Sequence, residues 1–252
     1  MLMQDKSNSA GLFEIYALSE KAITLDFGSV IDETLLKQVT DFKHILSQHP
    51  FPGLIAVVPA YASLSIFYEP VAVYKSSLPG INSYDKVSAY LQSLAGKNHT
   101  PLTHQSSVIN IPACYGNNWG PDLDYVAGIN NLSTDEVIKL HSAAEYKVYM
   151  IGFIPGFAYL GGMAEAIAAP RKPSPRRYVP AGSIGIAGNQ TGIYPLDSPG
   201  GWQVIAQTPL KMFDANRANP SLLKAGDIVK FQPVSFSEFR DIVENPGYLN
   251  AY

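Results

Sequence analysis

The sequence predicts an α+β protein with two domains, a small N-terminal α/β domain over residues 1–100 and a β-barrel or sandwich over residues 101–252. Length is the first observation, because 252 residues exceed the roughly 100–150 of a common single domain. The second is a change of pattern: helical and strand periods alternate at first, whereas later Gly and Pro separate short apolar runs. The polar stretch 96–105 is the predicted linker.

The first domain begins with apolar runs at residues 13–18 and 22–27, which predict the two arms of a hairpin. Apolar side chains at three- and four-residue spacing over residues 31–45 predict a helix, which Pro50 and Pro52 end. The remaining predicted elements are strands at 54–58 and 64–68 and a helix from Ser83, its expected N-cap, to Gly96.

Short apolar runs in the second domain predict the strands of a barrel or sandwich: residues 108–111, 147–153, 184–187, 204–207 and 228–231. Ser133 and Glu136 form a capping box for a helix that carries His141 on its apolar face. A shorter helix is expected from Pro121, with Asp122 and Asp124 at its N-terminal end.

Composition argues against several classes of partner. A net charge of −3 without a Lys- or Arg-rich run disfavours nucleic acid. No apolar run approaches the ~20 residues that span a bilayer, and the first residues lack the apolar core of a secretion signal, so neither membrane insertion nor export is expected. A single cysteine, Cys114, and the absence of a metal-ligand spacing predict no disulfide and no metal site, in keeping with the cytoplasm.

Residues 151–162, IGFIPGFAYLGG, interleave glycines with aromatic side chains. Such a segment forms either the rim of a ligand pocket or a glycine-kinked corner of a barrel with core aromatics. The turn before Trp202, SPGGW at 198–202, is explained by core packing.

Residues 179–195, VPAGSIGIAGNQTGIYP, are also rich in glycine, but they lack the Gly-Lys-Ser/Thr of a phosphate-binding loop. Ser183 lacks the strand, turn and helix context of a nucleophile elbow. Gln190, Thr191 and Tyr194 either bind a polar substrate or close turns. His141 is either a hydrogen-bonded structural histidine or a general acid or base.

Six motifs in order span nearly all of the second domain: GPDL at 120–123, IGFIPGFAYLGG at 151–162, Pro-Arg pairs at 170–171 and 175–176, VPAGSIGIAGNQTGIYP at 179–195, SPGGW at 198–202 and TPLKMFD at 208–214. In these motifs the chain resembles the family of 5-oxoprolinase B subunits, also known as allophanate hydrolase subunit 1 and kinase-A inhibitor. The resemblance implies a cyclophilin-like β-barrel for the second domain. It also implies a complex with homologues of the 5-oxoprolinase C and A subunits that opens 5-oxo-L-proline to L-glutamate with ATP and magnesium.

The resemblance also implies site residues, because phosphoryl activation and hydrolysis of a lactam need cations and carbonyl-binding donors. The candidates for catalysis are Arg171, Arg176 and His141. The candidates for substrate binding are Phe153, Pro155, Phe157, Gln190, Thr191 and Tyr194.

Two departures from the family pattern bear on activity. Asn117 and Asn118 stand where the family has Gly-Glu, and Ala206 and Gln207 stand where it has Gly-Arg, so a carboxylate and a cation are missing; Ala158 replaces a common proline. Two alternatives to a role in this enzyme stay open: a regulatory protein that inhibits a sensor histidine kinase, and a component of an allophanate or urea-amide hydrolase.

Overall fold

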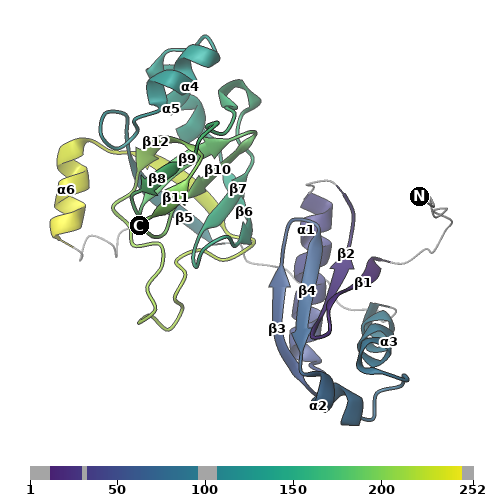
Figure 1. Cartoon of the computed structure of the whole chain (residues 1–252). Coiled ribbons are helices and arrows are strands. Elements are labelled where there is room, and N and C mark those ends of the chain that lie inside the picture. The colour runs from purple at the N-terminus through teal and green to yellow at the C-terminus, as the bar shows by residue number, and fades with distance from the viewer. Residues whose placement is uncertain (1–11, 30–32, 96–106, 246–252) are drawn as a thin grey trace. The chain divides into compact units, whose positions relative to one another are not determined.

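The computed structural model describes residues 12–29, 33–95 and 107–245, and the chain divides into two compact units, Met1–Thr103 and His104–Tyr252 (Figure 1). The predicted linker at 96–105 lies outside the described residues. The α+β class is confirmed, with a closed β-barrel in the second unit. None of the described helices is both long and apolar enough to cross a membrane.

The first unit contains an antiparallel sheet with the strand order β1-β2-β4-β3. Its elements are β1 (Glu14–Ser19), β2 (Ala22–Asp26), α1 (Glu33–Gln48), β3 (Leu54–Pro59), β4 (Ser63–Tyr68), α2 (Pro70–Lys75) and α3 (Ser83–Ala95). The hairpin β1–β2, both long helices and the two later strands confirm the sequence prediction, whereas the short α2 was not predicted. Helix α1 connects β2 to β3, and β4 enters between these two strands, which makes a split βαβ unit.

The core of the first unit lies between the sheet and helices α1 and α3. Phe42 of α1 and Leu91 of α3 are buried against Ile23 and Ile66 of the central strands. The predicted N-cap of α3 was wrong by one residue. Asn82 accepts the backbone N–H of Asp85 at 2.9 Å, whereas the Ser83 hydroxyl donates to the Pro70 carbonyl at 2.8 Å.

The second unit is a closed barrel with the strand order β10-β7-β6-β13-β5-β12-β9 (Figure 1). The strands are β5 (Val108–Tyr115), β6 (Tyr146–Ile151), β7 (Ala158–Gly161), β9 (Ser183–Ala187), β10 (Gln190–Ile193), β12 (Gln203–Gln207) and β13 (Ile228–Pro233). Among the strand pairs that the structure describes, only β5–β13 is parallel. A separate two-stranded sheet joins β8 (Arg176–Val179) to β11 (Ser198–Gly200).

The described helices of the second unit pack around the barrel (Figure 1). They are α4 (Leu123–Ile129), α5 (Thr134–Ala143), the 3₁₀ turn η1 (Glu165–Ile167) and α6 (Phe236–Glu244). The predicted capping box of Ser133 and Glu136 is confirmed at the start of α5. Helix α4 begins two residues after Pro121, and Asp122 at its N-cap position makes no capping hydrogen bond. The carboxylate of Asp122 is therefore available for other contacts.

Candidate functional site

A cleft of about 340 Å³ opens on the side of the barrel unit. Its walls come from the loop before β7, from β7 itself, from the segment before β8, and from the turns around β11. The lining residues are Phe153, Phe157, Tyr159, Arg171, Lys172, Pro175, Tyr194, Pro199, Gly200, Gly201 and Trp202. The cleft is therefore built by segments that lie well apart in the sequence.

Aromatic side chains form the apolar wall of the cleft. The buried ring of Phe157 lies 5.1 Å from that of Tyr194 and 5.4 Å from that of Trp202, both edge to face, and 4.7 Å from that of Tyr159. These rings belong to a small apolar cluster distinct from the barrel core. Edge-to-face packing fixes the ring planes, so the wall is rigid.

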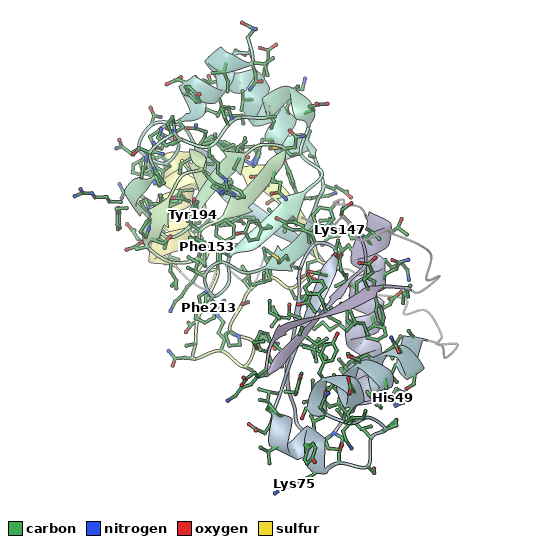
Figure 2. All side chains as sticks on the ribbon, turned by 45° about the vertical axis from the view of Figure 1, so that its right-hand side comes forward. His49, Lys75, Lys147, Phe153, Tyr194 and Phe213 are labelled. Atoms are coloured by element: carbon green, nitrogen blue, oxygen red, sulfur yellow. The ribbon has the colours of Figure 1, made fainter. Side chains whose placement is uncertain are left out.

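Phe153 stands at the mouth of the cleft with a left-handed backbone, φ 71°, and a side chain that is 65% exposed. Figure 2 shows Phe153 close to Tyr194, and its ring lies 5.7 Å from that of Phe157. A left-handed phenylalanine costs about 1–2 kcal/mol relative to ordinary backbone. Strain of this kind persists where the surrounding structure enforces it, often at ligand sites.

The strain at Phe153 predicts the relative stability of two variants. Phe153→Gly relieves the left-handed strain, whereas Phe153→Ala removes the same ring and keeps it. The Gly variant should therefore be more stable than the Ala variant by about 1 kcal/mol, in urea unfolding followed by tryptophan fluorescence. Equal stability of the two variants, or a more stable Ala variant, would contradict the strain.

Two cations line the cleft. The guanidinium carbon of Arg171 lies 5.9 Å from the Trp202 ring centroid, within the range of a cation–π contact. The Lys172 ammonium donates to Asp122 Oδ1 at 3.0 Å, and its side chain is 30% exposed. The cleft thus combines an aromatic wall with positive charge.

Asp122 is buried next to the cleft and binds two cations and a backbone N–H. Arg176 donates to its two oxygens at 2.6 and 2.7 Å, and the backbone N–H of Val204 donates to Oδ2 at 2.7 Å. Burial by itself raises the pKa of Asp122, but the hydrogen bonds from Arg176, Lys172 and Val204 outweigh it and hold the pKa below its ordinary value. Asp122 is therefore ionised at neutral pH.

The GPDL segment can hold Asp122 in this place because Gly120 has no side chain. A Cβ on Gly120 would lie 1.9 Å from the carbonyl oxygen of Ile205. The backbone N–H of Asp122 donates to the Val204 carbonyl at 2.8 Å, and the Val204 N–H donates to the Asp122 carboxylate. Val204 of β12 therefore bonds to both the backbone and the side chain of Asp122. Close approach of this segment to β12 is the reason for the glycine.

Tyr194 places a neutral hydroxyl in the cleft. Burial raises its pKa, while a hydrogen bond from the Trp202 backbone and the charge of Arg171 act against that shift. A Cβ on Gly200 would lie 2.4 Å from the Tyr194 hydroxyl, so the glycine of SPGGW makes room for it. The hydroxyl can therefore donate its proton to a ligand in the cleft.

His141 lies inside the barrel, with none of its surface exposed. Thr191 donates its hydroxyl proton to the Gly185 carbonyl, so it accepts the His141 Nε2–H at 3.0 Å; Nδ1 then accepts from the Tyr115 hydroxyl at 2.7 Å. Burial lowers the pKa of His141 to about 3. The imidazole is neutral and both of its nitrogens have partners.

The comparisons with known proteins agree with this architecture. The family model for the carboxyltransferase domain, subdomain C and D, matches residues 13–223. The B subunit of 5-oxoprolinase from Bacillus subtilis (strain 168) is 45% identical over 228 residues, which are 90% of this chain and 95% of that protein. The chain belongs to the family of 5-oxoprolinase B subunits.

Solved structures carry the same fold. TTHA0988 superposes with a TM-score of 0.72 at 34% identity over 85% of this chain, and the chain spans 40% of its length. The urea amidolyase of K. lactis superposes with a TM-score of 0.72 over 91% of this chain and 15% of its own, but at 18% identity it shows the fold alone.

The structure brings together only some of the candidate residues of this member of the 5-oxoprolinase family. Arg171, Phe153, Phe157 and Tyr194 line the cleft. Arg176 stands behind it on Asp122. The structure does not bring the other candidates, namely Pro155, Gln190, Thr191 and His141, to the cleft lining.

Sequence reasoning did not select four residues that line the cleft or contact its lining, namely Lys172, Asp122, Tyr159 and Trp202. Asp122 was interpreted as a helix N-terminal residue and Trp202 as core packing. The signal that could have found Asp122 was its place inside the GPDL motif, since a helix end needs no fixed sequence around its carboxylate. Lys172 directly follows the candidate Arg171 in the sequence.

The departures from the family pattern lie outside the cleft lining. Asn118 is exposed in the turn after β5, and Gln207 donates to the Ala181 carbonyl at 2.7 Å. Ala158 is buried at the start of β7. Neither position 118 nor position 207 therefore contributes a side chain to the cleft lining. Among residues 12–29, 33–95 and 107–245, no three His, Cys, Asp or Glu side chains group to hold a metal ion.

Proposed function

We propose that this chain is one component of a cytoplasmic, ATP-dependent complex that hydrolyses 5-oxo-L-proline to L-glutamate, and that its cleft binds the lactam acid. The observation that carries the proposal is the combination of Arg171 and Lys172 with a rigid aromatic wall, in a barrel of the 5-oxoprolinase family. The partners are homologues of the 5-oxoprolinase C and A subunits.

The size and chemistry of the cleft support a small acid as its ligand. At about 340 Å³ the volume lies near the lower end of the range of ligand cavities, roughly 300–1,000 Å³, which favours a lactam over a nucleotide. A carboxylate matches the two cations, and the apolar carbons of a small ring match the aromatic wall. ATP and its magnesium are assigned to the complex rather than to this cleft.

The residues of the cleft would bind and orient the substrate rather than attack it. ATP supplies a phosphoryl group that activates the lactam carbonyl, so that water can hydrolyse the ring amide. Lys172 and Arg171 would hold the carboxylate, and the Tyr194 hydroxyl would donate to an oxygen of the ring. The aromatic wall would exclude water from one face. His141 and Thr191 would have a structural role in the barrel. Arg176 would hold the Asp122 carboxylate and would not contact the substrate.

The test is a reconstitution of the chain with its own homologues of the C and A subunits. ATP-dependent release of L-glutamate from 5-oxo-L-proline is measured in the complete mixture and in mixtures that omit one component each. We expect activity only in the complete mixture. Allophanate and urea, supplied in place of 5-oxo-L-proline, should not be hydrolysed.

Other outcomes would sort the alternatives. Full activity of the C and A homologues without this chain would overturn the proposal and favour the regulatory interpretation, in which a histidine kinase is the partner. Hydrolysis of allophanate but not of 5-oxo-L-proline would favour the alternative of an allophanate or urea-amide hydrolase.

A further inference from the structure

Asp122 contacts the cleft only through another residue. Its carboxylate accepts hydrogen bonds from Lys172, Arg176 and the backbone of Val204, and of these three donors only Lys172 lines the cleft. The Asp122 side chain itself is 6% exposed. The hydrogen-bonded contact between this carboxylate and the cleft lining is therefore the one with the Lys172 ammonium.

The cluster holds more positive charge than its carboxylate neutralises. Lys172 and Arg176 supply two positive charges and Asp122 one negative charge, so the sum is +1. A structural ion pair is already complete with Arg176, whose guanidinium uses both carboxylate oxygens. Partial burial of a second cation costs free energy of desolvation. Lys172 is the member of the cluster that lines the cleft, so the excess positive charge faces the ligand there.

Lys172 is held at both ends. Its backbone N–H donates to the Gly201 carbonyl at 2.7 Å, and its ammonium donates to Asp122 at 3.0 Å. A free lysine side chain loses considerable rotamer freedom when a ligand orders it, and that loss weakens binding. A lysine that is ordered beforehand avoids the loss.

We propose that Asp122 is a positioning residue that holds the Lys172 ammonium at the cleft wall, so that the cleft meets the carboxylate of its ligand with one ordered cation. This inference rests on the proposed function. The hydrogen bond between Asp122 and Lys172 would give the cleft its preference for a small anion.

The first test compares Michaelis constants in the reconstituted complex. Asp122→Asn should raise the KM for 5-oxo-L-proline about three- to tenfold, with the kcat and the KM for ATP within about twofold. The substitution also removes a negative charge, which by itself would lower the KM for an anion, so a rise reports the lost position of Lys172 and a fall would overturn the assignment. A KM for ATP that rises as much as that for 5-oxo-L-proline, or a kcat that falls while both KM values stay constant, would overturn the assignment.

A double-mutant cycle separates positioning from a general structural role. Because Asp122 acts through Lys172, Asp122→Asn should change the KM for 5-oxo-L-proline by less than about twofold in a chain that already carries Lys172→Met. Effects that multiply in the double variant would show that Asp122 acts by another route.

A ligand-free measurement keeps this inference separate from the proposed function. The side-chain ¹⁵N–¹H signal of the Lys172 ammonium, assigned with Lys172→Met, should be visible in the unaltered chain and lost in Asp122→Asn. An unchanged signal would contradict positioning, whether or not the complex hydrolyses 5-oxo-L-proline. If Asp122→Asn does not fold, Asp122→Glu keeps the charge and lengthens the arm by one methylene; an unchanged KM and an unchanged Lys172 signal in that variant would overturn the proposal.

Discussion

Acidification from pH 6.5 to pH 4.5 should remove roughly 2–3 kcal/mol of the barrel's free energy of unfolding through His141 alone. The folded pKa of this histidine is about 3, because the imidazole is fully buried, whereas an unfolded histidine titrates near 6.5. Between these values the unfolded chain binds one proton more than the folded chain. Stability contributed by neutral His141 is therefore present above pH 6.5 and is lost by about 1.4 kcal/mol per unit as the pH falls toward 3.

The His141 effect can be isolated with one variant. His141→Gln keeps a donor and an acceptor near Thr191 and Tyr115 but does not titrate. Urea unfolding of both chains is followed at pH 6.5 and 4.5 by tryptophan fluorescence, which reports the barrel because Trp119 and Trp202 both lie in the second unit. Other groups, among them Asp122 and Asp227, titrate in both chains and cancel in the comparison. An equal loss of stability in the two chains would contradict the buried neutral histidine.

Removal of both cations of the cleft, in the variant Arg171→Met/Lys172→Met, should weaken binding of 5-oxo-L-proline by about 10- to 100-fold. A hydrogen bond to a charged group contributes about 1.5–3 kcal/mol, and 1.4 kcal/mol is a factor of ten in affinity. Each cation should contribute less than this range, about 0.7–1.4 kcal/mol, because Arg171 is exposed and Lys172 partly exposed, and solvent screens both.

A matched control for the cation variant is Lys211→Met/Arg217→Met. Lys211 and Arg217 pair with Asp214 at 3.0 and 4.0 Å and do not line the cleft, so their removal takes away the same two charges elsewhere on the unit. The control should bind 5-oxo-L-proline as the unaltered chain does. If it weakened binding as much as the cleft variant, the effect would come from net charge rather than from the cleft.

Local signals made most of the fold predictable. The capping box of Ser133 and Glu136 joins residues three positions apart, and the hairpin β1–β2 follows from two neighbouring apolar runs. Strands β7 and β10 were not predicted, because β7 lies in a glycine- and aromatic-rich segment without a clear apolar run and β10 begins with the polar residues Gln190 and Thr191. The two strands pair with each other in the closed barrel, a contact that no local pattern shows.

The candidate site depended on contacts that no local pattern carries. Asp122 meets Arg176 at a separation of 54 residues and Val204 at a separation of 82. His141 and Thr191 have suitable chemistry, but α5 and β10 bury both side chains, where they bond to each other at 3.0 Å rather than face the cleft. Sequence could therefore identify the segments that carry the site, while the direction of each side chain required the three-dimensional fold.

The most direct test of the account is a titration of the two tryptophan indole ¹⁵N–¹H signals with 5-oxo-L-proline, on the chain alone and with its homologue of the C subunit. Trp202 lines the cleft, whereas Trp119 packs against Phe236 of α6 and serves as an internal control. We predict a saturable shift of the Trp202 signal, an unchanged Trp119 signal, and a titration displaced to higher concentration in Arg171→Met/Lys172→Met. A Trp202 signal that stays unchanged in both preparations, or that shifts no more than Trp119, would contradict the cleft as the substrate site.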